Sequence, residues 1–368
     1  MMRIIKLSCV SSAILLSCFA NAQNVSATLH FAQQIHSTDG DVHVELELTN
    51  HENKPVNLLK WATAEEGISG DLFTVKRDGK EVSYLGALYK RRAPNEKDYI
   101  EILPGESISY KVELSALYDF SAPGQYEISY NAESVHLYRN TDLQIATSKS
   151  IPRKVNELKS NTAVTWLDGE VQVFENDQLH TNSVFAATSY ASCSNSQKST
   201  INSAWSSAKT MSANATSYLT GRSTSQLESS ARYTTWFGDP TVRVGFLWLT
   251  KAHERVEENF TATTDAIKNK PLSFDCSCTS SGTYAYVYPS QPYKIYFCGA
   301  FWGAPRTGTD SQAGTIIHEV SHFNAVAGTD DHAYGHSGAK QLASSDVKKA
   351  IENADSYEYF AENTPYQN

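Results

Sequence analysis

The spacing of apolar residues changes once along this 368-residue chain, and the change divides it into two parts. In the first part, the segments 42–48, 108–114 and 126–130 alternate apolar with polar residues, with Asn, Gly and Pro between them. A period of two buries one side of each strand, so these segments predict a small β-sandwich.

The second part has a helical period. From about residue 195, apolar residues recur three or four positions apart, at Ile201, Trp205, Ala208, Met211 and Ala215. Alternating tyrosines at 284–288 and the segment 294–298 add two strands, so an α+β fold is expected for residues 191–368.

A polar segment separates the two parts. Residues 151–190 carry Lys154 and Lys159 near their start and lead into a run rich in Ser and Asn. Such composition predicts an exposed, cleavable linker between domains at 23–150 and 191–368. The hairpin-like piece 164–174, around Asp168-Gly169, could still belong to the sandwich.

Residues 1–22 have the features of a secretory signal peptide. Arg3 and Lys6 precede an apolar stretch, and Ala20-Asn21-Ala22 is a small-x-small cleavage site. A lipoprotein signal ending at Cys18 is the competing interpretation, although Leu16 is bulky for such a site. We expect cleavage after Ala22 and a secreted protein.

Charge and hydropathy exclude two kinds of partner. The formal net charge is −9 and the chain has no long run of Lys or Arg, so nucleic acid and anionic membrane surfaces are not expected as partners. No later stretch is apolar over the ~18 residues that a membrane span needs.

Four of the six cysteines follow the predicted signal peptide: Cys193, Cys276, Cys278 and Cys298. An even number in an exported protein predicts two disulfides. Cys276 and Cys278 are too close to pair comfortably, so each should pair with Cys193 or Cys298. A thiolate zinc site is the alternative, but a C-x-C pair lacks the usual C-x-x-C spacing.

The stretch His318-Glu319-Val320-Ser321-His322 carries the strongest chemical signal. Thr309 and Gln312 could form a capping box, and an apolar stripe predicts a helix over about 310–326 that Gly328 ends. Two histidines four apart on one helix face can bind one zinc ion, and the adjacent Glu319 can act as general base toward a water.

A catalytic zinc needs a third protein ligand. The metzincin pattern is excluded, because its third histidine would stand at Gly328. Spacing leaves Asp330, Asp331 and His332 as candidates on the turn beyond the helix. A gluzincin-like site using Glu352 or Glu358 is a further alternative.

H-E-V-S-H followed by Gly328-Thr329-Asp330-Asp331-His332-Ala333-Tyr334-Gly335 resembles the signature of the aspzincin zinc proteases, which include deuterolysin and the peptidyl-Lys metalloendopeptidases. The resemblance implies that Asp331 is the third ligand of one zinc ion per catalytic domain. It also implies that Tyr334 helps to stabilise the oxyanion.

From about Ser192 onward the chain is similar to the peptidyl-Lys branch, notably in 232–238, 274–278 and 298–302. This similarity implies the disulfides Cys193–Cys276 and Cys278–Cys298. The sequence predicts a helix over about 346–361 that places Asp355 and Glu358 on one face, which by itself favours a solvated surface. The segment Asn353-Ala354-Asp355-Ser356-Tyr357-Glu358-Tyr359-Phe360 matches the family's pocket for lysine, which implies cleavage on the amino side of lysine.

The resulting hypothesis is a secreted zinc endopeptidase that acts on proteins or peptides and is made with its own pro-domain. The pro-domain could also serve folding or bind a separate partner. Self-cleavage before Lys154, Lys159 or Lys198 could release it. The alternatives are a broad-specificity protease of the deuterolysin type and, in another class, a secreted binding or adhesion protein with a structural zinc site. Glu319 argues against the last, because a structural site needs no general base.

Overall fold

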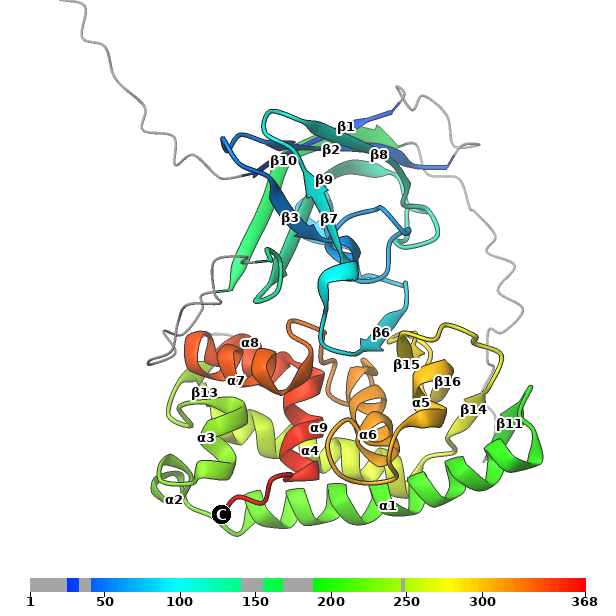
Figure 1. Cartoon of the computed structure of the whole chain (residues 1–368), viewed down its shortest axis with the longest axis vertical. Coiled ribbons are helices and arrows are strands. Elements are labelled where there is room, and N and C mark those ends of the chain that lie inside the picture. Colours follow the sequence, from blue (N-terminus) through cyan, green and yellow to red (C-terminus); the bar gives the residue numbers. More distant parts are fainter. Residues whose placement is uncertain (1–24, 33–40, 140–154, 168–187, 246–248) are drawn as a thin grey trace, which may run out of the picture.

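The computed structural model describes residues 25–32, 41–139, 155–167, 188–245 and 249–368. The predicted signal peptide lies outside the described residues. Figure 1 shows the strands of the N-terminal part above the helices of the C-terminal part. Within the described part of the chain, no helix is both long and apolar enough to cross a membrane.

The N-terminal part, residues 25–167, is built from β-sheets around one apolar core. Alternate residues of most of its strands face this core, as Val44, Leu46 and Leu48 do, which confirms the predicted period of two. Its sheets have the orders β1-β2-β8, β10-β9-β4-β5 and β3-β7. The strands are β1 (Val25–Phe31), β2 (His43–Asn50), β3 (Val56–Leu59), β4 (Phe73–Arg77), β5 (Lys80–Glu81), β7 (Tyr99–Ile102), β8 (Ser107–Glu113), β9 (Gly124–Ser134) and β10 (Asn156–Leu167), with short 3-10 helices at Lys60–Ala62 and Glu96–Asp98.

Strand β10 corrects the predicted linker of residues 151–190. It pairs antiparallel with β9 and buries Leu158, Ala163 and Leu167. These residues lie in the same apolar core as the other strands. Residues 156–167 therefore belong to the four-stranded sheet β10-β9-β4-β5 of the N-terminal part, and Lys159 lies within a paired strand.

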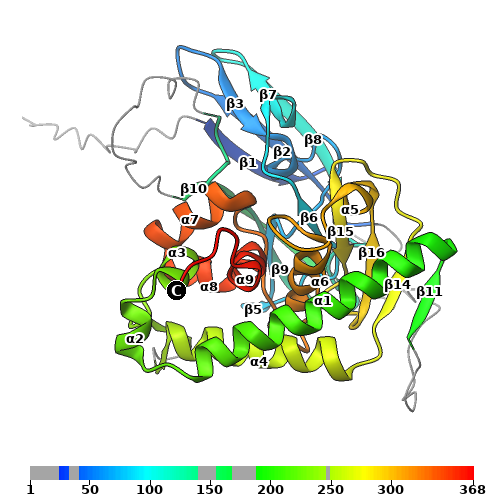
Figure 2. The same cartoon turned by 60° about the horizontal axis from the view of Figure 1, so that its bottom comes forward.

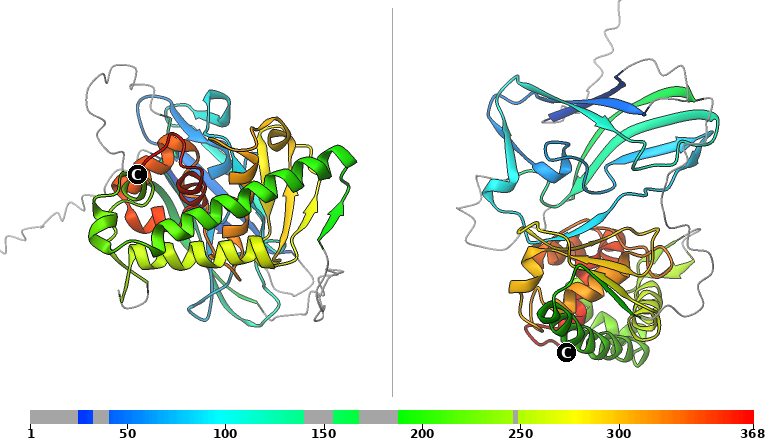
Figure 3. Two further views of the ribbon diagram at one scale, coloured as in Figure 1. Left: turned by 90° about the horizontal axis from the view of Figure 1, so that it is seen from below. Right: turned by 90° about the vertical axis from the view of Figure 1, so that its right-hand side faces the viewer.

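The C-terminal part combines helices with a five-stranded sheet and a separate two-stranded one, in agreement with the predicted mixture of helices and strands. Helices α1 and α4 run side by side on the face away from the N-terminal strands (Figures 2 and 3), and α6 packs between them and α9. The helices are α1 (Asn195–Thr220), α2 (Thr224–Glu228), α3 (Ala231–Phe237), α4 (Ala252–Asn269), α5 (Gly299–Gly303), α6 (Gln312–His322), α7 (Gly335–Ser345), α8 (Val347–Glu352) and α9 (Ala354–Glu362). The strands are β11 (Ser189–Ala191), β12 (Arg243–Val244), β13 (Thr250–Lys251), β14 (Ser273–Asp275), β15 (Thr283–Val287) and β16 (Lys294–Phe297).

Two disulfides lie beside this sheet, Cys193–Cys276 and Cys278–Cys298. This is the pairing that the family resemblance implies. The first joins the start of α1 to the end of β14, and the second joins the next loop to the start of α5.

One strand crosses between the two parts. β6 (Leu88–Arg91) comes from the N-terminal half but forms the edge of the C-terminal sheet, whose order is β11-β14-β16-β15-β6. It runs antiparallel to β15, with Lys90 opposite Ala285 and Tyr89 opposite Tyr286. The two parts therefore share a sheet, which a boundary at residue 150 does not anticipate.

Candidate metal centre and adjoining pocket

Helix α6 carries the two histidines through the middle of the C-terminal core. Its N-cap is Ser311, whose hydroxyl accepts a hydrogen bond from the Gly314 amide at 2.9 Å, and not Thr309 as predicted. Every residue of α6 is buried. The helix ends at His322, four residues earlier than predicted, because Phe323 leaves the helical conformation with a ψ of 130°.

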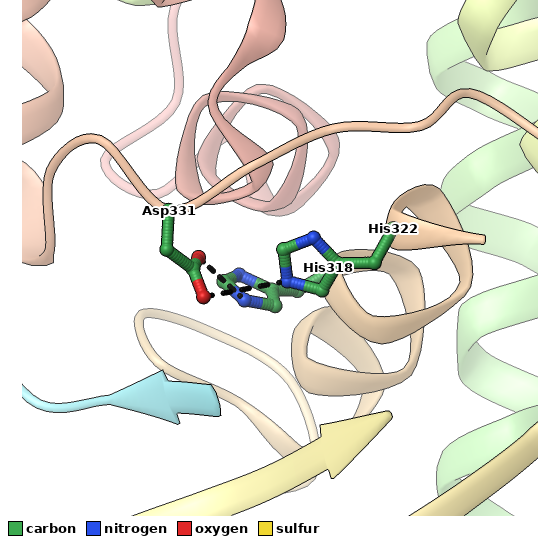
Figure 4. A group of neighbouring side chains, drawn as sticks. All are labelled: His318, His322 and Asp331. Carbon is green, nitrogen blue, oxygen red and sulfur yellow. Dashed lines mark ion pairs between the residues drawn. The ribbon is translucent and has the colours of Figure 1, made fainter. Parts of the chain in front are cut away.

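His318, His322 and Asp331 come together as Figure 4 shows. Asp331 approaches both imidazoles, with one oxygen 3.2 Å from His318 Nε2 and the other 3.5 Å from His322 Nε2. One potential ligand atom from each residue lies within 4.8 Å of the others. The three sequence-predicted ligands thus converge on one point.

The segment after α6 places Asp331. Gly328 adopts a positive φ of 58°, which lets the chain reverse. Asp330 then pairs with the α8–α9 junction: its amide donates to the Glu352 carbonyl at 2.7 Å, and its carbonyl accepts from the Ala354 amide at 2.9 Å. Two backbone hydrogen bonds on the preceding residue therefore fix the position of Asp331.

The alternative ligands have other contacts. The Asp330 side chain accepts a hydrogen bond from the Asp331 amide, and His332 Nε2 lies 4.0 Å from the Glu352 carboxylate. Glu352 is largely exposed, and Glu358 groups with His318 and Asp355 but not with His322. The geometry favours Asp331.

Both imidazoles are oriented through Nδ1. His322 Nδ1 lies 2.8 Å from the Thr329 carbonyl, which can only accept, so Nδ1 carries the proton and Nε2 is left as a ligand. His318 Nδ1 makes an ion-pair contact of 2.9 Å with Asp355. Burial lowers the pKa of His322, which favours the neutral form that a metal ligand requires.

The residues present fit a metal ion. His318 Nε2, His322 Nε2 and both oxygens of Asp331 are buried and lack hydrogen-bond partners in the described structure. Buried polar atoms without partners are costly, so their convergence on one point is the arrangement expected of a binding site for a cation. Two imidazoles and a carboxylate are a donor set that suits zinc.

Glu319 follows His318 on the same helix. Its side chain is fully buried, and neither carboxylate oxygen has a hydrogen-bond partner among the described residues. Burial raises the pKa of Glu319 to about 8. A carboxylate in such surroundings is suited to accepting and releasing a proton near neutral pH.

Tyr334 lies at the boundary between the two parts of the chain. Its hydroxyl donates a hydrogen bond of 2.9 Å to the Tyr89 carbonyl on β6. Its ring packs edge-on against Trp61. The side chain can therefore donate to a peptide carbonyl beside the candidate metal site.

Asp355 and Glu358 do not form a solvated face, because both are fully buried. Between them lies the ammonium group of Lys90, 3.4 Å from Asp355 and in direct contact with Glu358. Asp310 lies 3.8 Å from the same nitrogen. Burial opposes the charge on Lys90, but the carboxylates raise its pKa well above the ordinary value.

Sequence reasoning did not identify Lys90 or Thr329 as part of the site. Lys90-Arg91-Arg92 has the composition of an exposed basic turn. Thr329 was noted only as part of the family signature, with no role assigned to it. Lys90 is 265 positions from Asp355, so no local pattern reveals the contact.

Comparison with known proteins identifies the family. Residues 222–362 match the aspzincin family model, described as a lysine-specific metallo-endopeptidase. An extracellular protease of Aeromonas hydrophila is 45% identical over 339 residues, which cover 90% of each chain. The chain belongs to the aspzincin family of metalloendopeptidases. A peptidyl-Lys metalloendopeptidase of Grifola frondosa is 36% identical over 81% of this chain and 80% of its own length. One of Pleurotus ostreatus is 46% identical over 48% of this chain and 97% of its own length.

Proposed function

We propose that this metalloendopeptidase is secreted as a pro-enzyme and cleaves proteins or peptides on the amino side of lysine. The convergence of His318, His322 and Asp331, with Glu319 unpaired beside them, carries the proposal for the chemistry. The names of the fungal relatives and the carboxylate pair support the specificity.

Each side chain has a role in the proposed reaction. His318, His322 and Asp331 would hold one zinc ion, which when bound supplies a Lewis acid that activates water and polarises the substrate carbonyl. Glu319 accepts a proton from the attacking water and delivers it to the leaving amine. Tyr334 donates a hydrogen bond to the carbonyl oxygen as it gains charge. Asp355 and Glu358 bind the lysine ammonium group.

The proposal for the N-terminal part is that residues 23–150, together with β10, form a β-sandwich pro-domain behind a signal peptide. The Pleurotus ostreatus relative supports this. It is also named a peptidyl-Lys metalloendopeptidase, although nearly its whole length, 97%, matches only 48% of this chain. The name of the Aeromonas hydrophila relative, extracellular protease, supports secretion.

Mass spectrometry of a digested test protein checks the proposal. The processed enzyme should release peptides that begin with lysine, and a zinc chelator or Glu319→Ala should abolish them. Cuts with no preference for lysine would favour the broad-specificity deuterolysin type. Cutting that survives the chelator would contradict the metal mechanism.

A further inference from the structure

We propose that strand β6 occupies the substrate site of its own enzyme in the manner of a substrate, with Tyr89–Lys90 in the place of the bond to be cleaved. The N-terminal part would then inhibit the precursor by direct competition, with Lys90 as the main anchoring side chain. This inference rests on the proposed function.

The position of β6 is that of an added strand. It pairs with the outer side of β15 at the edge of the sheet, and it contacts helix α6, which carries the histidines. Extended peptides commonly bind enzymes by adding a strand to an open edge, where backbone hydrogen bonds supply affinity and side-chain pockets supply specificity.

The side chain of Lys90 fills the predicted lysine pocket. It is fully buried, and its nitrogen contacts Asp355 and Glu358. The rings of Tyr284 and Tyr359 lie 5.1 and 5.8 Å from this nitrogen. A lysine seldom gives up its hydration so completely unless charged partners replace the water.

The backbone gives the same register independently. The carbonyl that accepts the hydrogen bond from Tyr334 belongs to Tyr89, directly before Lys90. An enzyme that cuts on the amino side of lysine breaks that peptide bond. A slip of one residue would turn Lys90 to the other face of the strand. The hydrogen bond from Tyr334 and the burial of Lys90 in the carboxylate pair therefore require the same register.

Further contacts hold the N-terminal part in place. His136 Nε2 lies 3.0 Å from the Tyr334 carbonyl, Glu133 forms an ion pair with Lys349, and Val135 packs against α7 and α8. Because β6 is tethered, its local concentration is on the order of millimolar, which a dilute free substrate cannot match. A lysine that only sealed a domain interface would not need this alignment with Tyr334.

The test measures binding in the full-length chain with Glu319→Ala, which prevents turnover. The probe is a fluorescent peptide with one internal lysine, followed by anisotropy. Adding Lys90→Ala should tighten binding about tenfold or more, because the tethered competitor is removed. Lys111→Ala, a change of an exposed lysine on β8, is the matched control. It should bind the peptide as weakly as the full-length Glu319→Ala protein without a second change.

Equal binding by the Lys90→Ala and Lys111→Ala proteins would overturn the inference. Thermal melting shows whether the Lys90→Ala protein is folded. If it is not, the same measurement is made with Lys90→Met, which keeps the buried aliphatic stem but removes the charge. The processed enzyme is given the same peptide as a substrate. If it does not cut before lysine, the proposed specificity fails; if it does and Lys90 has no effect on binding, only the competition by β6 fails.

Discussion

Two buried polar clusters meet at His318 and differ in how their charges are compensated. In the cluster of His318, His322 and Asp331, the inward-facing atoms have no hydrogen-bond partners among the described residues. In the neighbouring cluster, Asp355 and Glu358 receive a cation from the chain itself, on Lys90. Within the described residues, the chain itself therefore supplies a cation to the second cluster but not to the first.

The largest effect is expected from a change in the unpaired cluster. His322→Ala removes one of the three proposed ligands, so zinc should be lost and activity should fall by more than the ~10–100-fold that changes in outer-shell partners cause. Zinc per protein after dialysis, measured by mass spectrometry, and peptidase activity are the readouts. His332→Ala is the matched control and should keep its zinc. If the His322→Ala protein keeps its zinc, the metal does not bind at the proposed site.

The paired cluster should govern specificity. Glu358→Gln in the processed enzyme leaves a lysine substrate with one carboxylate fewer in a buried site, where losing one partner costs about 3–5 kcal/mol. We expect kcat/KM for a lysine peptide to fall by about 10²–10⁴, with little change for a matched leucine peptide. Glu352→Gln, at an exposed site on α8, serves as the control. An equal loss for both peptides would point to a structural role.

The smallest effect should appear where the clusters touch. Asp355 contacts His318 Nδ1 as well as Lys90, so Asp355→Asn should also weaken zinc binding by about 10-fold, as outer-shell changes do. Glu358→Gln should leave zinc affinity nearly unchanged, because Glu358 lies farther from this nitrogen, at 3.4 Å. Competition with a chromogenic chelator measures both affinities. If the two variants bind zinc with identical affinity, the contact between Asp355 and His318 does not couple the two clusters.

Local patterns predicted much of this arrangement. The four-residue spacing of His318 and His322 places both on one helix face whatever surrounds the helix. Asp331 required the family signature, because spacing alone left Asp330 and His332 open. The strands of the N-terminal part followed from their alternation.

Long-range contacts account for what was missed. The single helix predicted over 346–361 is two helices, α8 and α9. The helix is interrupted at Asn353, whose side chain accepts a hydrogen bond from the Ala333 amide. Ser311 caps α6 in place of Thr309, and its hydroxyl bonds to Glu362, 51 residues away. The burial of Lys90 depends on a still more distant partner, Asp355, which lies 265 positions away.

The break at Asn353 has a consequence for redesign. The same junction holds Asp330, next to the proposed metal ligand Asp331, and begins the helix that carries the proposed lysine pocket. Random substitutions there would disturb catalytic competence and selectivity together, so few would survive a screen for new cleavage preferences. An engineering effort should therefore vary Glu358 first and leave residues 330 and 353–355 unchanged.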